Sequence, residues 1–111
     1  MLPWGGQEKW LPAGVFHLAE VTMYVVLVHV TILPGRHDEA MATLRDHIVP
    51  MTKGAPGFVR GTWFGDEQSG NGLVVFDSED SARAMSAQVT SGPDDPVRVE
   101  DVQVYEVQAE A

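Results

Sequence analysis

Four histidines are the residues of this chain best suited to acid–base chemistry or metal binding: His17, His29, His37 and His47. Imidazole titrates near neutral pH, and apolar surroundings perturb it further, so His29 in its apolar run is the best candidate for a general base. The competing interpretation of His29 is a hydrogen-bonded residue at an interface. None of the four is spaced as a ligand pair. His37 and His47 would lie about 15 Å apart along one helix at 1.5 Å per residue, so no metal site is predicted.

Aromatic, cationic and hydroxyl side chains supply the other candidates. Trp63 is suited to pack against a flat aromatic molecule and to donate a hydrogen bond through its indole N–H. Tyr105 is suited to hold a phenol oxygen. Arg60 is suited to an anionic group, with Thr31 as a second polar contact for a bound molecule. Each has a structural alternative, namely core or interface packing for the aromatic residues and a salt bridge across a dimer for Arg60.

His47 borders the apolar face of the first expected helix, three residues after Leu44 and one before Ile48. That position allows it to look into a pocket between helix and sheet, as a third catalytic candidate beside His29 and Trp63. The alternative is simple exposure on the flank of the helix.

Composition excludes several function classes. The chain has 16 acidic and 7 basic residues in 111, a formal charge of −9, which disfavours nucleic acid and anionic membranes as partners. It has no cysteine, which removes disulfides, thiolate nucleophiles and iron–sulfur clusters. There is no apolar run of about 20 residues and no signal-peptide pattern at the start, so we expect a cytoplasmic protein.

Periodicity predicts the elements that position these residues. The β-branched run from Tyr24 to Ile32 reads as a strand, with residues 24, 26, 28, 30 and 32 facing a core and residues 25, 27, 29 and 31 on a more polar face. Apolar residues at spacings of three and four predict a helix between Arg36 and Gly54, which Pro50 should kink or end. The rest of the chain predicts strands over 58–65 and 73–77 around a turn at 66–72, a helix capped by Ser78, and a strand over 97–107.

This order predicts one α+β domain over residues 23–111, a ferredoxin-like βαββαβ fold. Its four-stranded antiparallel sheet would carry both helices on one face. The other face would show His29, Thr31 and some of Arg60, Trp63 and Tyr105. A bare apolar sheet face favours pairing with a second copy of the chain, so we expect a homodimer.

Residues 1–22 form an N-terminal appendage with prolines, glycines and two tryptophans but no sustained period. Three interpretations stay open: a vestige of an upstream start with Met23 as the true beginning, a strap whose tryptophans dock on a partner, or a disordered tail.

From residue 24 to residue 107 the sequence resembles the dimeric α+β barrel superfamily, and within it the antibiotic-biosynthesis-monooxygenase-like (ABM) domains. The resemblance is carried by a valine-rich first strand before Pro34-Gly35, Ala55-Pro56-Gly57-Phe58-Val59, Trp63-Phe64, Leu73-Val74-Val75-Phe76-Asp77-Ser78-Glu79 and Val102-Gln103-Val104-Tyr105-Glu106-Val107. It implies a homodimeric α/β barrel with an apolar pocket between sheet and helices in each protomer.

Known activities of that superfamily include cofactor-free oxygenation of quinols and haem degradation. The haem-degrading members place a histidine on the second helix and an asparagine on the first strand, and residues 78–91 and 24–32 lack them. The resemblance therefore implies a cofactor-independent monooxygenase acting on an aromatic or quinol molecule, with His29 as base. The alternative is a non-catalytic dimeric module of the same fold, for ligand binding or assembly.

Overall fold

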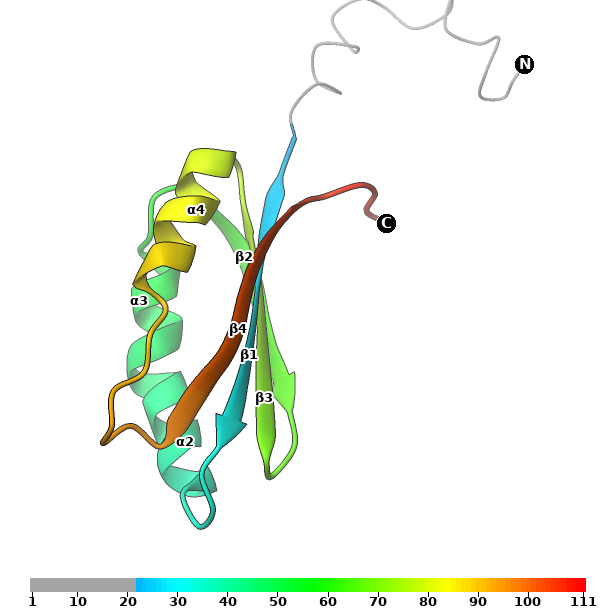
Figure 1. Ribbon diagram of the computed structural model, residues 1–111. Helices are drawn as coiled ribbons and strands as arrows, with labels where there is room; N and C mark the ends of the chain where they lie inside the picture. Colours follow the sequence, from blue (N-terminus) through cyan, green and yellow to red (C-terminus); the bar gives the residue numbers. More distant parts are fainter. Residues whose placement is uncertain (1–21) are drawn as a thin grey trace, which may run out of the picture.

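The computed structural model describes residues 22–111, so the interpretations of the N-terminal appendage lie outside the described residues. The fold is α+β: a four-stranded antiparallel sheet with two helices, the first formed by three segments in succession (Figure 1). In chain order the elements are β1 (Tyr24–Ile32), α2 (His37–Thr43), the π-helical segment η2 (Leu44–Ile48), α3 (Val49–Lys53), β2 (Phe58–Gly65), β3 (Ser69–Phe76), α4 (Glu79–Gln88) and β4 (Val97–Glu106).

The sheet has the strand order β2-β3-β1-β4, so the two chain-terminal strands lie side by side. Both helices cover the same face of this sheet, and the other face carries no helix (Figure 1). We call these the covered face and the bare face. β1 is central, and its residues pair with β3 on one side and β4 on the other.

The predicted alternation along β1 is confirmed. Val26 is fully buried and Ile32 is 4% exposed, whereas His29 on the opposite face is exposed. Val26 packs with Val74, Phe76 and Ala82 in the core of the covered face. The rings of Phe58 and Phe76 meet edge to face at 6.4 Å between centroids, a favoured aromatic geometry.

The first helix does not end at Pro50 but widens just before it. Proline has no N–H to donate and its ring crowds the carbonyl four residues earlier, so regular α-helical bonding fails at this point. The chain responds with the π-helical segment, in which the N–H of Val49 donates to the carbonyl of Leu44, five residues back. The helix then continues to Lys53 and ends at Gly54.

The hairpin between β2 and β3 is tighter than the sequence suggested. We expected residues 66–72 to form the turn, but β3 already begins at Ser69, and Gly70, Asn71 and Gly72 are strand residues paired on both sides. The carboxylate of Asp66 accepts hydrogen bonds from the backbone N–H groups of Gln68 and Ser69, both at 2.9 Å. That Asx-type turn reverses the chain within three residues and frees the glycines for the sheet.

The second helix begins as predicted, because the Ser78 hydroxyl accepts from the N–H of Ser81 at 3.1 Å. Gly57, with φ +80°, lets β2 start directly against this helix start. A Cβ at Gly57 would lie 2.5 Å from the Ser81 hydroxyl, so no other residue fits without a shift.

The C-terminal residues cross the bare face. After β4 the chain turns to the side of the sheet away from the helices (Figure 1), and Glu110 forms an ion pair with Arg60 of β2. Since β1 and β3 lie between β4 and β2, residues 107–110 span these strands. Among residues 22–111, no helix has the length and apolar character required to cross a bilayer.

Candidate functional site

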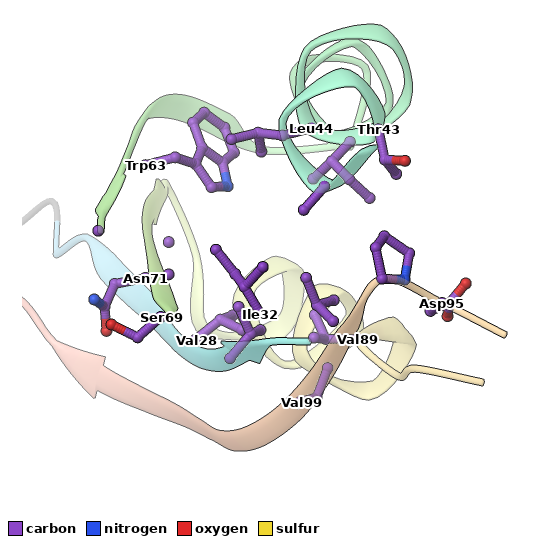
Figure 2. Close-up of a pocket in the computed structure, with 18 of the residues that line it drawn as sticks. Val28, Ile32, Thr43, Leu44, Trp63, Ser69, Asn71, Val89, Asp95 and Val99 are labelled. Carbon is purple, nitrogen blue, oxygen red and sulfur yellow. The ribbon is translucent and has the colours of Figure 1, made fainter. Parts of the chain in front are cut away.

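A cavity of about 680 Å³ lies between the covered face of the sheet and the first helix (Figure 2). Its floor is formed by the covered-face residues of β1 and β4, and its roof by the helix. Its walls are mostly aliphatic: Val28, Val30, Ile32, Met41, Leu44, Ile48, Met85, Val89, Val97 and Val99. This size and lining are typical of sites for small organic molecules.

The cavity is hollow because glycines occupy covered-face positions of β3. Gly72 pairs with Val28 and Gly70 with Val30, so two side chains are missing from the middle of the sheet. A Cβ at Gly72 would lie 3.0 Å from Nε1 of Trp63, and one at Gly70 would lie 3.2 Å from Val30. The glycines therefore make room for the indole and for the space beside it.

Trp63 forms one end wall of this cavity. Its strand partner is Gly72, and the indole lies over the backbone of β3 with its nitrogen turned toward the cavity (Figure 2). Within residues 22–111, no protein acceptor forms a hydrogen bond with this N–H. The site thus offers a flat apolar wall and one available donor. We expected Trp63 to be partly on the bare face, and the structure places it on the covered face.

The charged residues of the lining gather at the end of the cavity where β1 ends and α2 begins. His37 opens α2, Asp66 lies in the hairpin turn, and Asp95 precedes the buried Pro96. Nδ1 of His37 lies 3.9 Å from the carboxylate of Glu67. The acidic residues of the lining therefore lie at one end of the cavity, away from Trp63.

The Asp66 carboxylate is held in its ionised form. Hydrogen bonds from the backbone N–H of Gln68, the backbone N–H of Ser69 and the Ser69 hydroxyl lower the pKa of Asp66 below its ordinary value of 3.8, and the nearby His37 adds to that effect. Asp66 therefore carries a negative charge at neutral pH.

Arg36, which precedes His37 and contacts the backbone of Asp95, already has its donors engaged. The guanidinium of Arg36 donates to both oxygens of Glu39, at 2.9 and 2.7 Å. It also donates to the backbone carbonyls of Asp94 and Asp95, at 2.9 and 3.1 Å. These bonds raise the pKa of Arg36, with the Glu39 bond as the largest cause, and Arg36 itself does not line the cavity.

Four of the six residues predicted from the sequence lie on the bare face. His29 is hydrogen-bonded through Nδ1 to the side-chain oxygen of Asn71 at 3.1 Å, and the Thr31 hydroxyl donates to Glu100 at 2.7 Å. Arg60 pairs with Glu110, and Tyr105 is 52% exposed. None of these four side chains lines the cavity.

The other two predicted residues, His47 and Trp63, differ in whether they line the cavity. His47 is exposed on the π-helical segment and outside the cavity, which agrees with the alternative of an exposed flank. Trp63 is thus the one predicted site residue of the six that lines the cavity.

Sequence reasoning missed His37, Asp66 and the two β3 glycines. His37 was considered only as a metal ligand, although it follows the Pro34-Gly35 turn and so begins a helix at the end of a core strand. Gly70 and Gly72 were assigned to a turn. Their spacing in the sequence could have indicated this role, since two glycines that are two residues apart lie on the same face of a strand.

No metal site is formed by the described residues, since residues 22–111 contain no group of three or more His, Asp or Glu side chains placed to hold an ion. Comparison with protein-family models and with curated protein sequences finds no match to this chain.

Proposed function

We propose that this protein binds a small aromatic molecule in the cavity beside Trp63, as one protomer of a ferredoxin-like homodimer of the ABM type. The observation that carries the proposal is the cavity of about 680 Å³ with an indole wall and aliphatic surroundings. Burying one face of a flat ring on such a surface contributes about 25 cal/mol per Å² of apolar area removed from water.

The fold-level part of the proposal is supported by the strand order β2-β3-β1-β4 with both helices on one face. In a ferredoxin-like fold the two crossovers place the helices in that way, and the bare face then requires a cover. The resemblance in sequence layout adds the dimeric barrel to this proposal.

A second copy of the chain is the cover we propose for the bare face. Phe64 is 53% exposed, Tyr105 52% and Leu73 38%, and all three lie on this face. Stable dimers bury about 800 Å² per partner, so the interface would have to extend over much of this face. The Arg60 and Glu110 pair lies at the rim of this surface, where charged residues are common.

Cofactor-independent oxygenation is the chemistry we propose for an enzyme of this kind, and His37 is the observation that favours it. The reaction needs a base beside the substrate. His29, the base predicted from the sequence, faces away from the cavity, whereas His37 lines it.

The proposed reaction converts a hydroquinone and dioxygen into a hydroxyquinone and water. His37 removes a phenol proton, and the resulting anion transfers an electron to dioxygen. A bond then forms between a ring carbon and oxygen, and the O–O bond breaks. One oxygen atom stays on the ring and the other leaves as water with two substrate hydrogens. The substrate loses four electrons and dioxygen gains four.

Binding is tested by thermal unfolding with naphthylethanol, a neutral two-ring probe, beside a Gly72→Val variant. A ligand at about 100 times its Kd stabilises the folded state by about 2.7 kcal/mol, which corresponds to a Tm increase of about 10 °C in a domain of this size. We expect that increase in the wild type and little in Gly72→Val, whose added side chain meets Trp63. Equal increases in both proteins would place the probe outside the cavity.

Catalysis is tested by oxygen uptake with naphthalene hydroquinone, for the wild type, His37→Ala and His29→Ala. We expect uptake above the autoxidation background that falls at least about tenfold in His37→Ala and changes little in His29→Ala. If the probe binds but no protein consumes oxygen, the non-catalytic binding module is the better account.

A further inference from the structure

The cavity has two chemically different ends, and this difference restricts what it can hold. The apolar end lies at the level of Val28, beside Trp63 and Met85. The charged end lies four residues further along β1, near Ile32, or about 13 Å at 3.3 Å per strand residue. A ligand that fills the space therefore has a ring at one end and a polar group at the other.

The charges at the polar end have one predominant sign. The lining includes the acidic residues Asp66 and Asp95 and no lysine or arginine among the described residues. Nδ1 of His37, the histidine of the described lining, already lies 3.8 Å from the carboxylate of Asp38 and 3.9 Å from that of Glu67. A bound anion would meet two carboxylates with no free cation to offset them.

The position of Arg36 supports the same conclusion. Its guanidinium contacts the backbone of Asp95, but Glu39 and two backbone carbonyls occupy its donors. Turning it into the cavity would break a bidentate carboxylate pair and leave those carbonyls without a partner. Arg36 therefore stays outside the cavity, where its charge also interacts with Asp95, and the acidic residues Asp66 and Asp95 are in the lining.

We propose that the ligand is an aromatic molecule with a basic amine, bound with its ring against Trp63 and its ammonium group at the Asp66 and Asp95 end. This inference rests on the proposed binding function and narrows its ligand class. Carboxylates and phosphates of the same shape are rejected by charge, and neutral analogues bind with intermediate affinity.

The test is isothermal titration calorimetry at low ionic strength with three probes that share one ring system. These are naphthylethylamine, naphthylethanol and naphthylacetate, which differ in charge but little in size. We expect the amine to bind about tenfold more tightly than the alcohol, and the carboxylate to bind at least about tenfold more weakly than the alcohol.

Charge-neutralising variants then show which carboxylates cause the preference for the amine. Asp66→Asn keeps a side-chain oxygen that can accept the turn hydrogen bonds, and Asp95→Asn keeps the acceptor for the N–H of Gly92. Each should lower the ratio of amine to alcohol affinity about threefold or more. Asp101→Asn, on the bare face, removes the same charge outside the cavity and should leave the ratio unchanged.

The outcomes separate the two proposals. If the alcohol does not bind, the proposed binding function fails and the ligand class fails with it. If the alcohol binds while the carboxylate binds as tightly as the amine, the cavity is confirmed as a binding site and the amine proposal is overturned. A preference for the amine that Asp101→Asn lowers as much as Asp66→Asn also overturns it, because the effect would then be one of net charge.

Discussion

The two faces of the sheet are built from the same strands, but the side chains leave a cavity on one face and fill the other. On the covered face, Gly70 and Gly72 oppose valines of β1, and the missing side chains leave a cavity under the helix. On the bare face, one residue along, Asn71 and Leu73 fill the same strand and leave an apolar surface with small polar clusters. Alternation along a strand thus separates a binding pocket from an interface.

The role of a residue can be predicted from its type only when the face of the sheet on which its side chain lies is known. His29 and His37 are both histidines close to β1. His29 bonds to Asn71 on the bare face, whereas His37 lines the cavity from the start of α2. Only the second lines the same cavity as Trp63.

The largest expected difference between the faces is in stability. Phe76→Ala removes a fully buried ring that packs on Phe58, so we expect a loss of about 3–5 kcal/mol in unfolding free energy. Phe64→Ala, at a half-exposed position on the bare face, should cost about 1 kcal/mol or less in the monomer. Urea unfolding at low protein concentration measures both. Similar losses in the two variants would mean that the bare face is also part of a packed core.

The next difference is in ligand binding. Gly72→Val and Leu73→Val place the same side chain at neighbouring positions that face opposite ways. The first crowds Trp63 and fills the cavity floor, so naphthylethanol binding should weaken at least about thirtyfold. The second should leave it within about twofold. Titration calorimetry measures the affinity of both variants for naphthylethanol. A larger loss of affinity in Leu73→Val would place the ligand on the bare face.

The bare face should control self-association. Leu73→Glu puts a charge into the proposed dimer surface and should raise the dimer Kd at least about tenfold, because a buried unpaired charge is costly. Ala87→Glu adds the same charge on the exposed side of α4 and should have no such effect. Sedimentation equilibrium distinguishes them. A wild-type protein that stays monomeric at high micromolar concentration would contradict the proposed interface.

The smallest expected effect is the pH dependence of the polar cluster on the bare face. The Thr31 hydroxyl, and after it Arg98, lower the pKa of Glu100 below its ordinary value of 4.5. A lowered carboxyl pKa contributes stability that is complete above about pH 4.5 and is lost as the pH falls through the folded-state value. Thr31→Val removes the largest cause, so its Tm should approach that of the wild type as the medium is made more acidic. A difference in Tm that stays constant from neutral to acidic pH would contradict this assignment.

Sequence periodicity was sufficient to predict the helices and strands, because the burial of one face imposes that periodicity. Residues 24–32 alternate regularly enough that the strand bounds and its two faces follow from the sequence. The Ser78 cap and the helix after it follow from local chemistry in the same way.

The cavity did not follow, because it depends on long-range pairing. Gly70 and Gly72 look like turn residues until Asp66 is seen to complete the turn within three residues, and only the register with Val28 and Val30 shows what their missing side chains leave open. The π-helical segment has a local cause in Pro50, but its effect on the cavity roof depends on the packing of the whole helix.

The most direct test of the account is a nitrogen-15 NMR titration of the indole N–H of Trp63 with naphthylethanol. The resonance is assigned by its loss in Trp63→Phe. We expect a saturable shift of this resonance in the wild type and none in Gly72→Val. An unchanged Trp63 resonance at probe saturation, with shifts confined to His29, Leu73 and Tyr105, would contradict it and place the ligand site on the bare face.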